Sequence, residues 1–295
     1  MCIRDRSAGL SRRFPGLTVQ EIENEKERVC SYIDDVLAGI RQQTSAMILW
    51  AGFEHPVYPA TGILDAQQEH SQSSVITDLN NYVRSRLRQM DAAYFLDTSM
   101  ILSRVGADHF YDYRYWHIGK APYSRAALQE VAAEVIKYLR PVMGKTRKCL
   151  VLDCDNTLWG GVIGEDGLAS IALGSTYPGS PYYEFQQEVV NLFHRGVLIA
   201  LCSKNNPEDV WEVFDRHPDM VLKREHIVAS QINWDDKASN LKKIAADLNI
   251  GLDALVYIDD SEFEINLVKS ALPDVTVLHA HGDHSVEFRT MLVSC

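Results

Sequence analysis

Residues 151–161, which read Val-Leu-Asp-Cys-Asp-Asn-Thr-Leu-Trp-Gly-Gly, decide the fold of this chain. The apolar run 149–152 ends here on two carboxylates, Asp153 and Asp155. Short apolar runs bounded by turn residues are typical of buried parallel strands, and the reactive groups of open α/β sheets lie just beyond the carboxyl ends of such strands. Side chains two apart on a strand point the same way, so the two carboxylates can share one ion or divide the roles of nucleophile and acid/base. The competing interpretation is a strand end followed by a solvated acidic turn.

The composition is that of an ordinary globular protein, with 46% apolar and 23% charged residues in a chain of 295 residues, which allows two domains or one large one. The formal net charge of -11 argues against a general nucleic-acid surface and is compatible with Mg²⁺ at a carboxylate cluster. No apolar run approaches the roughly 18–20 residues that span a bilayer, and the first residues lack a signal-peptide core. The six cysteines lie far apart, which predicts reduced thiols in a cytoplasmic protein.

The first half of the chain alternates helical and strand patterns, which indicates a small α/β layer. Residues 1–15 show neither pattern cleanly and suggest a ragged or artificial start. The flexible, basic segment 144–148 is the best linker, so we expect one domain over 1–144 and another over 145–295. The expected elements are helices at 18–43, 75–90 and 125–140, the last ending before Pro141, and strands at 46–53 and 93–96.

The second half is more regular, because three apolar strands each end in a polar cluster at the same edge. This arrangement predicts a doubly wound parallel sheet with its site along one rim. Residues 160–167 are expected to form a glycine-punctuated turn or hairpin. The expected elements are strands at 149–153, 197–202, 254–258 and 275–278, and helices at 181–195, after Pro207, at 236–248 and at 262–271.

The polar clusters that follow these strands suit phosphoryl chemistry. One carboxylate can attack phosphorus, and a second can act as general acid and then base. A hydroxyl and an ammonium can hold the phosphate oxygens, while further carboxylates complete the oxygen-rich site that Mg²⁺ prefers. For Lys237 the alternative is a solvated lysine at a helix start. In chain order the clusters are Asp153-x-Asp155-x-Thr157, Ser203, Lys237 and Asp259-Asp260.

In type, order and strand context these four motifs resemble those of the haloacid dehalogenase (HAD) superfamily of aspartate-nucleophile phosphotransferases, over about residues 148–280. The resemblance implies that Asp153 is the nucleophile and that Asp155 is the acid/base. It also implies that Ser203 and Lys237 bind phosphate. The implied Mg²⁺ ligands are Asp153, Asp259, Asp260 and Asp155, the last through its main-chain carbonyl.

A narrower resemblance is to the FkbH-like branch, whose signature is similar to residues 152–167. That branch loads glyceryl units onto acyl carrier proteins in polyketide biosynthesis. It implies 1,3-bisphosphoglycerate as donor, a carrier-bound glyceryl thioester as product, and released phosphate. The substrate-binding residues indicated are Thr157, Ser203, Lys204, Asn205 and Lys237, and further similar motifs are Phe185-Gln186, Asn233-Trp234 and Asp259-Asp260.

The same resemblance implies a HAD-like domain without a cap, preceded by a partial α/β region like an SGNH hydrolase. No Gly-Asp-Ser nucleophile block occurs before residue 145, so no esterase activity is predicted there. The gaps Thr157–Ser203 and Ser203–Lys237 are too short for an inserted cap of more than about 50 residues. An uncapped site is open to a large substrate such as the phosphopantetheine arm of a carrier protein.

Several alternatives stay open. Cys154 is either an acyl relay next to the nucleophile or a small buried core residue. The protein is either the glyceryl transferase/phosphatase, a HAD phosphatase of a small metabolite, or a non-catalytic carrier-docking module. The histidine cluster at 279–284 is expected to be a solvated loop, since nothing completes a zinc site there.

Overall fold

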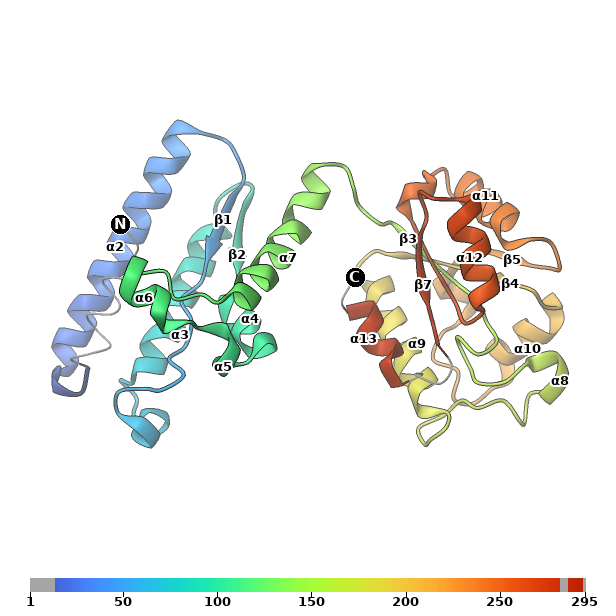
Figure 1. Cartoon of the computed structure of the whole chain (residues 1–295), viewed down its shortest axis with the longest axis horizontal. Helices are drawn as coiled ribbons and strands as arrows, with labels where there is room; N and C mark the ends of the chain where they lie inside the picture. Colours follow the sequence, from blue (N-terminus) through green and yellow to red (C-terminus); the bar gives the residue numbers. More distant parts are fainter. Residues whose placement is uncertain (1–13, 282–285, 294–295) are drawn as a thin grey trace. The chain divides into compact units, whose positions relative to one another are not determined.

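The computed structural model of the protein describes residues 14–281 and 286–293 (Figure 1). Contacts within the chain divide it into two compact units, Met1–Leu139 and Arg140–Cys295. Most of the predicted irregular start, residues 1–13, lies outside the described residues, and so do the last three residues of the histidine cluster, 282–284.

The first unit contains two parallel strands, β1 (Ile48–Ala51) and β2 (Ala93–Leu96). The helices α2 (Val19–Gln43) and α3 (Gln72–Leu87) bury apolar stripes in one core with β1. This arrangement follows from the three- and four-residue spacing of their apolar side chains. The other helical segments of this unit are η1 (Phe14–Gly16), η2 (Gly62–Gln67), α4 (Thr98–Val105), α5 (Ala107–Phe110), α6 (Tyr113–Gly119) and α7 (Arg125–Val142).

Two helices of this unit, α7 and α3, have bounds that differ from the sequence prediction by two or three residues. Helix α7 includes Pro141 instead of ending before it, since a proline in the last turn removes only one backbone hydrogen bond. Helix α3 begins at Gln72 because the Ser71 hydroxyl caps it, accepting a hydrogen bond of 3.0 Å from the Ser74 amide. The SGNH-hydrolase-like character of this unit stays a prediction.

The second unit is organised around one five-stranded parallel sheet with the strand order β5-β4-β3-β6-β7, which confirms the predicted α/β fold class. Strand β3, which precedes the Asp-x-Asp segment, lies at the centre between β4 and β6. The strands are β3 (Cys149–Leu152), β4 (Leu198–Ser203), β5 (Ile227–Ile232), β6 (Leu255–Asp259) and β7 (Thr276–His279).

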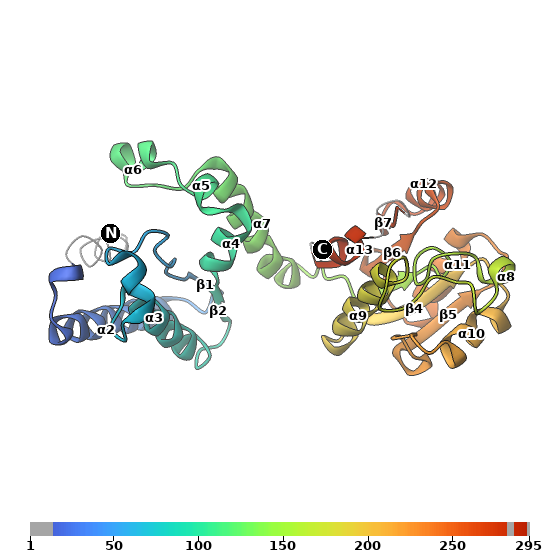
Figure 2. The ribbon, with the colours of Figure 1, turned by 90° about the horizontal axis from the view of Figure 1, so that it is seen from below.

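Helices cover both faces of this sheet, as Figure 2 shows. Leu150 and Leu152 pack into the core on one face, and Cys149 and Val151 pack into the core on the other. A strand buried on both faces is apolar throughout, which explains the unbroken run before Asp153. The first face carries α9 (Ser180–His194), α10 (Pro207–Arg216) and α13 (Phe288–Val293), and the second carries α11 (Lys237–Asp247) and α12 (Glu262–Ala271).

The sequence prediction was wrong about two parts of this unit. It missed strand β5, which pairs with β4 at the sheet edge, and it missed helix α13. The expected turn or hairpin at 160–167 is a single helical turn, α8 (Ile163–Asp166), beside a bridge between Gly160 and Ala172. Two short 3-10 turns, η3 (Arg224–His226) and η4 (Leu252–Ala254), precede β5 and β6. Among the described residues, no helix is long and apolar enough to cross a membrane.

Candidate active site

The polar clusters meet at the carboxyl edge of the central strands. Asp153 follows β3 directly, Ser203 is the last residue of β4, and Asp259 is the last residue of β6. Because β3 lies between β4 and β6, these side chains are neighbours although they are far apart in sequence. This is the edge at which open α/β sheets bind their ligands.

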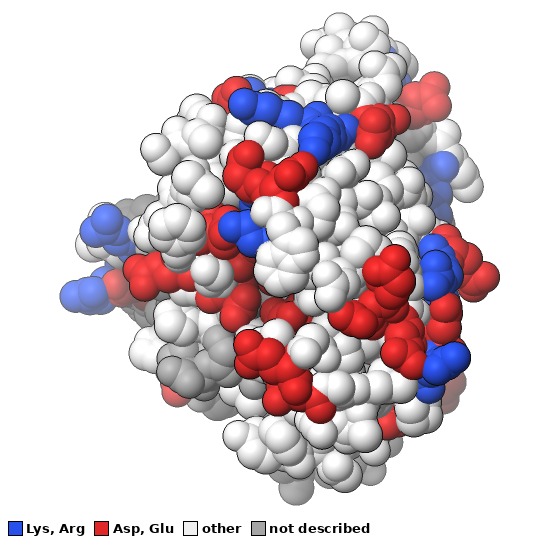
Figure 3. Space-filling view, turned by 90° about the vertical axis from the view of Figure 1, so that its right-hand side faces the viewer, with Lys and Arg blue, Asp and Glu red and all other residues white. Residues whose placement is uncertain are grey.

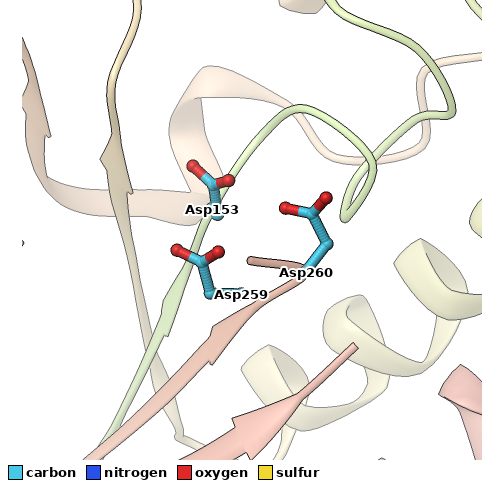
Figure 4. Close-up of side chains that lie close together, drawn as sticks. All are labelled: Asp153, Asp259 and Asp260. Atoms are coloured by element: carbon cyan, nitrogen blue, oxygen red, sulfur yellow. The ribbon is translucent and has the colours of Figure 1, made fainter. Parts of the chain in front are cut away.

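Three carboxylates form an acidic cluster at this edge. Asp153 comes from the end of β3, while Asp259 and Asp260 come from the end of β6, and Figure 4 shows the three side chains close together. One oxygen of each lies within 4.8 Å of the others. Asp153 and Asp259 are buried and Asp260 is half-buried. An all-oxygen donor set at this spacing fits Mg²⁺.

Electrostatics supports the same fit. Burial raises the pKa of Asp260 to about 6, and the neighbouring carboxylates Asp153 and Asp259 add to the rise. Burial likewise raises the pKa of Asp153, against the opposing effect of Lys237. Carboxylates that resist ionisation together are stabilised as anions by a divalent cation.

The raised pKa of Asp260 predicts how metal binding depends on pH. Mg²⁺ affinity should fall about tenfold per pH unit below pH 6, because a proton then competes for this ligand. Between about pH 4 and pH 6, Asp260 of the folded, metal-free protein still holds a proton, whereas Asp260 of the unfolded chain has lost it. The metal-free protein should therefore lose stability as the pH rises through this window.

Calorimetric titration with Mg²⁺ from pH 5 to pH 8 measures the affinity, and denaturant unfolding with chelator measures the stability. An affinity that stays constant across this range would contradict the assignment of Asp260 as a ligand.

Lys237 is the cation inside the cluster. Its Nζ atom lies 2.8 Å from Oδ1 of Asp153 and 2.6 Å from Oδ2 of Asp259, and the residue is only 3% exposed. Burial lowers the pKa of Lys237, but the two carboxylates outweigh it and the net pKa is raised. The alternative of a solvated lysine is therefore wrong. Helix α11 places the residue at its first position, capped by Asp236, whose Oδ1 atom accepts a 2.8 Å hydrogen bond from the Ser239 amide.

Asp259 is held more firmly than Asp260. Its Oδ2 atom accepts hydrogen bonds from Lys237 and from the hydroxyl of Tyr257, and its Oδ1 atom accepts one of 2.8 Å from the Ser261 amide. Asp259 therefore serves to orient Lys237, and Asp260 is the less constrained of the two candidate ligands.

Asp155 is fixed by three donors. Its Oδ1 atom accepts hydrogen bonds from Nε1 of Trp159 at 2.9 Å and from the Ile163 amide at 3.1 Å. Its Oδ2 atom accepts one of 2.8 Å from Nδ2 of Asn205. A carboxylate held in one orientation suits an acid/base, and its side chain is not part of the three-carboxylate cluster. A metal contact through the Asp155 carbonyl stays a prediction.

The predicted substrate-binding residues differ in what they contact. Ser203 is buried at the end of β4, and its hydroxyl opposes the rise in the pKa of Asp153. The Thr157 hydroxyl is buried without a hydrogen-bond partner among the described residues, so it is free to meet a ligand. Asn205 donates to Asp155, which makes it a positioning residue. Lys204 donates to Oε1 of Glu264 at 2.7 Å.

Cys154 lies in the apolar core with Leu158 and Phe185 and is 0% exposed. Burial raises the pKa of its thiol well above the ordinary value, and the adjacent Asp153 adds to the rise. Both features oppose the formation of an accessible thiolate. The structure therefore favours the packing interpretation of this residue.

Gln186 is a buried residue that braces the site and to which the sequence assigned no role. From helix α9 its Nε2 atom donates to the Leu158 carbonyl at 2.7 Å. Its Oε1 atom accepts hydrogen bonds from the amides of Val221 and Leu222 at 3.0 and 3.1 Å. It thus anchors the nucleophile segment to the loop before β5. The signal in the sequence is a polar residue on the apolar face of a helix, beside Phe185.

The connections around the site are short. The connection from Thr157 to Ser203 holds only α8 and α9 besides β4, and the connection to Lys237 holds α10, η3 and β5. Neither contains a folded cap. Acidic side chains predominate over basic ones on the face of this unit that Figure 3 shows.

The fold and this site together define the class of protein. A doubly wound parallel sheet with an Asp-x-Asp segment after its central strand, a buried lysine and a second acidic pair is the HAD-like phosphatase fold.

The chain is similar over both units to a solved structure, the N-terminal part of the protein BF1531 from Bacteroides fragilis, which contains a phosphatase domain and was solved with Mg. The two are 30% identical with a TM-score of 0.79, and the match covers 93% of this chain and 76% of that one. The chain therefore belongs to the HAD phosphatase family to which that protein belongs.

Two more distant matches each cover about half of this chain. A HAD family enzyme of Bacteroides thetaiotaomicron, with magnesium and inorganic phosphate, is 12% identical over 45% of this chain and 93% of that one, with a TM-score of 0.33. The 3-deoxy-D-manno-octulosonate 8-phosphate phosphatase of Moraxella catarrhalis is 14% identical over 53% of this chain and 92% of that one, with a TM-score of 0.28. No protein-family model and no functionally curated protein matches the chain.

Proposed function

We propose that the protein is a Mg²⁺-dependent glyceryl transferase/phosphatase that takes 1,3-bisphosphoglycerate and loads a glyceryl unit onto an acyl carrier protein. The observation that carries the phosphatase part is the contact of Lys237 with both Asp153 and Asp259 beside Asp260. The similarity to a phosphatase-containing protein solved with Mg supports the same chemistry. The glyceryl and carrier part rests on the resemblance of residues 152–167 to the FkbH-like branch and on the short rim.

The carboxylates divide the phosphatase chemistry between them. An oxygen of Asp153 attacks the phosphorus, the ester P–O bond breaks, and Asp155 donates its proton to the leaving oxygen. Asp155 then takes a proton from water, and this water cleaves the aspartyl phosphate to release phosphate and restore Asp153. Bound Mg²⁺ would neutralise charge between the carboxylates and the phosphate. Loading is completed when the carrier thiol attacks the acyl carbon and displaces the acyl phosphate group.

One incubation tests the proposal. The protein is mixed with 1,3-bisphosphoglycerate, Mg²⁺ and a phosphopantetheinylated carrier, and the mass of the carrier is measured by mass spectrometry. A mass gain equal to one glyceryl group supports the transferase. Phosphate release without carrier loading supports the alternative, a phosphatase of a small phosphorylated metabolite. Neither product supports a non-catalytic docking module.

Cys154→Ala separates the two interpretations of this cysteine. Because the thiol is fully buried, we expect the variant to load the carrier at a rate within about twofold of the wild type. Its stability should fall by about 1 kcal/mol, the usual effect of a small core truncation. Loss of loading with phosphate release retained would instead establish the relay.

A further inference from the structure

Lys204 and Glu264 form an ion pair that the chemistry above does not use. Nζ of Lys204 lies 2.7 Å from Oε1 of Glu264. Lys204 directly follows Ser203 at the end of β4, and Glu264 lies in the first turn of α12, four residues after Asp260. Because β3 lies between β4 and β6, this pair spans the carboxyl end of the strand that presents the nucleophile.

The two partners differ in burial. The Glu264 side chain is 9% exposed, whereas the Lys204 side chain is 35% exposed. Lys204 is therefore accessible from the rim, and it supplies the charge that makes an ionised Glu264 tolerable there.

The second carboxylate oxygen of Glu264 takes no part in the ion pair. Its Oε2 atom is buried and has no hydrogen-bond partner among the residues that the structure describes. Leaving a buried carboxylate oxygen without a donor is unfavourable, and native proteins rarely do so without a reason. A ligand that brings a donor to this point would remove the penalty.

We propose that Glu264 and Lys204 form a subsite for the non-reacting part of the phosphorylated substrate, in which Oε2 of Glu264 accepts a hydrogen bond from a substrate hydroxyl. The subsite rests on the proposed function, because the glyceryl donor offers one hydroxyl group, on the carbon next to its phosphate ester. It makes Glu264 a specificity-determining residue that selects hydroxylated phosphate esters over plain alkyl ones.

The test compares two phosphate esters that differ only in hydroxyl groups, glycerol 3-phosphate and propyl phosphate. Binding is measured by calorimetry with Mg²⁺ on the full chain carrying Asp153→Asn, which prevents turnover. We expect glycerol 3-phosphate to bind roughly tenfold or more tightly than propyl phosphate, the size of one hydrogen bond to a charged acceptor. Adding Glu264→Met should remove this preference and leave the affinity for propyl phosphate within about twofold.

Two further variants isolate the cause. Glu262→Met removes an exposed carboxylate from the same helical turn and should keep the full preference. Glu264→Gln keeps an acceptor oxygen without the charge and should keep part of it. A purely structural role for Glu264 would weaken both esters in parallel, which would overturn the subsite.

Other results are also decisive. Equal binding of the two esters before Glu264 is changed would overturn the subsite, and so would the absence of binding by both. Failure of the proposed function would give a different result from failure of the subsite. It would appear as wild-type protein that releases no phosphate from 1,3-bisphosphoglycerate, whatever the ratio of the two affinities.

Discussion

Asp153→Asn is expected to lower phosphate release by at least about a thousandfold, because a carboxamide cannot form the aspartyl-phosphate bond. The substitution also removes one negative charge from the three-carboxylate cluster, so Mg²⁺ should bind more weakly. Release of inorganic phosphate under saturating Mg²⁺ is the measurement. Circular dichroism should show an unchanged fold, since the two side chains have nearly the same shape.

The matched control is Asp274→Asn, which alters an exposed aspartate in the turn before β7. It should leave the rate within about twofold of the wild type, as surface substitutions usually do. Phosphate release by Asp153→Asn at the wild-type rate would reject the nucleophile assignment and, with it, the phosphatase part of the proposed function.

Lys237→Met should have the second largest effect, on both activity and stability. Its ammonium contacts Asp153 and Asp259, so its removal leaves two buried carboxylates without their cation. Breaking a buried pair in this way costs about 3–5 kcal/mol, which corresponds to a loss of roughly 6–20 °C in melting temperature for a domain of this size. Phosphate release should fall sharply as well, since the proposed function gives this ammonium the role of holding phosphate oxygens.

The stability loss should be smaller with Mg²⁺ than with chelator, because the metal supplies positive charge to the same carboxylates. Lys243→Met provides the comparison, as Lys243 forms a solvent-exposed ion pair with Asp235 near the same helix. Exposed pairs contribute little, so this variant should melt within about 1–2 °C of the wild type. Equal melting temperatures for the two variants would contradict the buried ion pairs of Lys237.

The sequence contains most of the information about the centre of the second unit. The apolar run before Asp153 and the similar runs before Ser203 and Asp259 are buried on both faces, and strands of this kind are recognisable without neighbours. Because parallel strands present their carboxyl ends at one edge, the convergence of the polar clusters was predictable from chain order alone.

The parts that could not be predicted depend on tertiary contacts. Strand β5 lies at the sheet edge and its residues alternate in exposure, so its short pattern gives a weak signal. The ion pairs of Lys237 and the bond between Asn205 and Asp155 join segments far apart in the chain. No local pattern encodes them. The burial of Cys154 follows the alternation along β3, and the sequence left its role open because a reactive and a structural cysteine look alike there.

The anchor formed by Gln186 has a consequence for how this fold can diversify. The amide nitrogen of Gln186 bonds to the backbone of Leu158, and its amide oxygen bonds to the backbone of Val221 and Leu222. A longer loop before β5 would therefore disturb the segment that follows Asp153. The stretch 164–170 is largely exposed and carries no such tether. An insertion in this stretch would leave the hydrogen bonds of Gln186 in place, so a lid could grow there without moving Asp153 and Asp155.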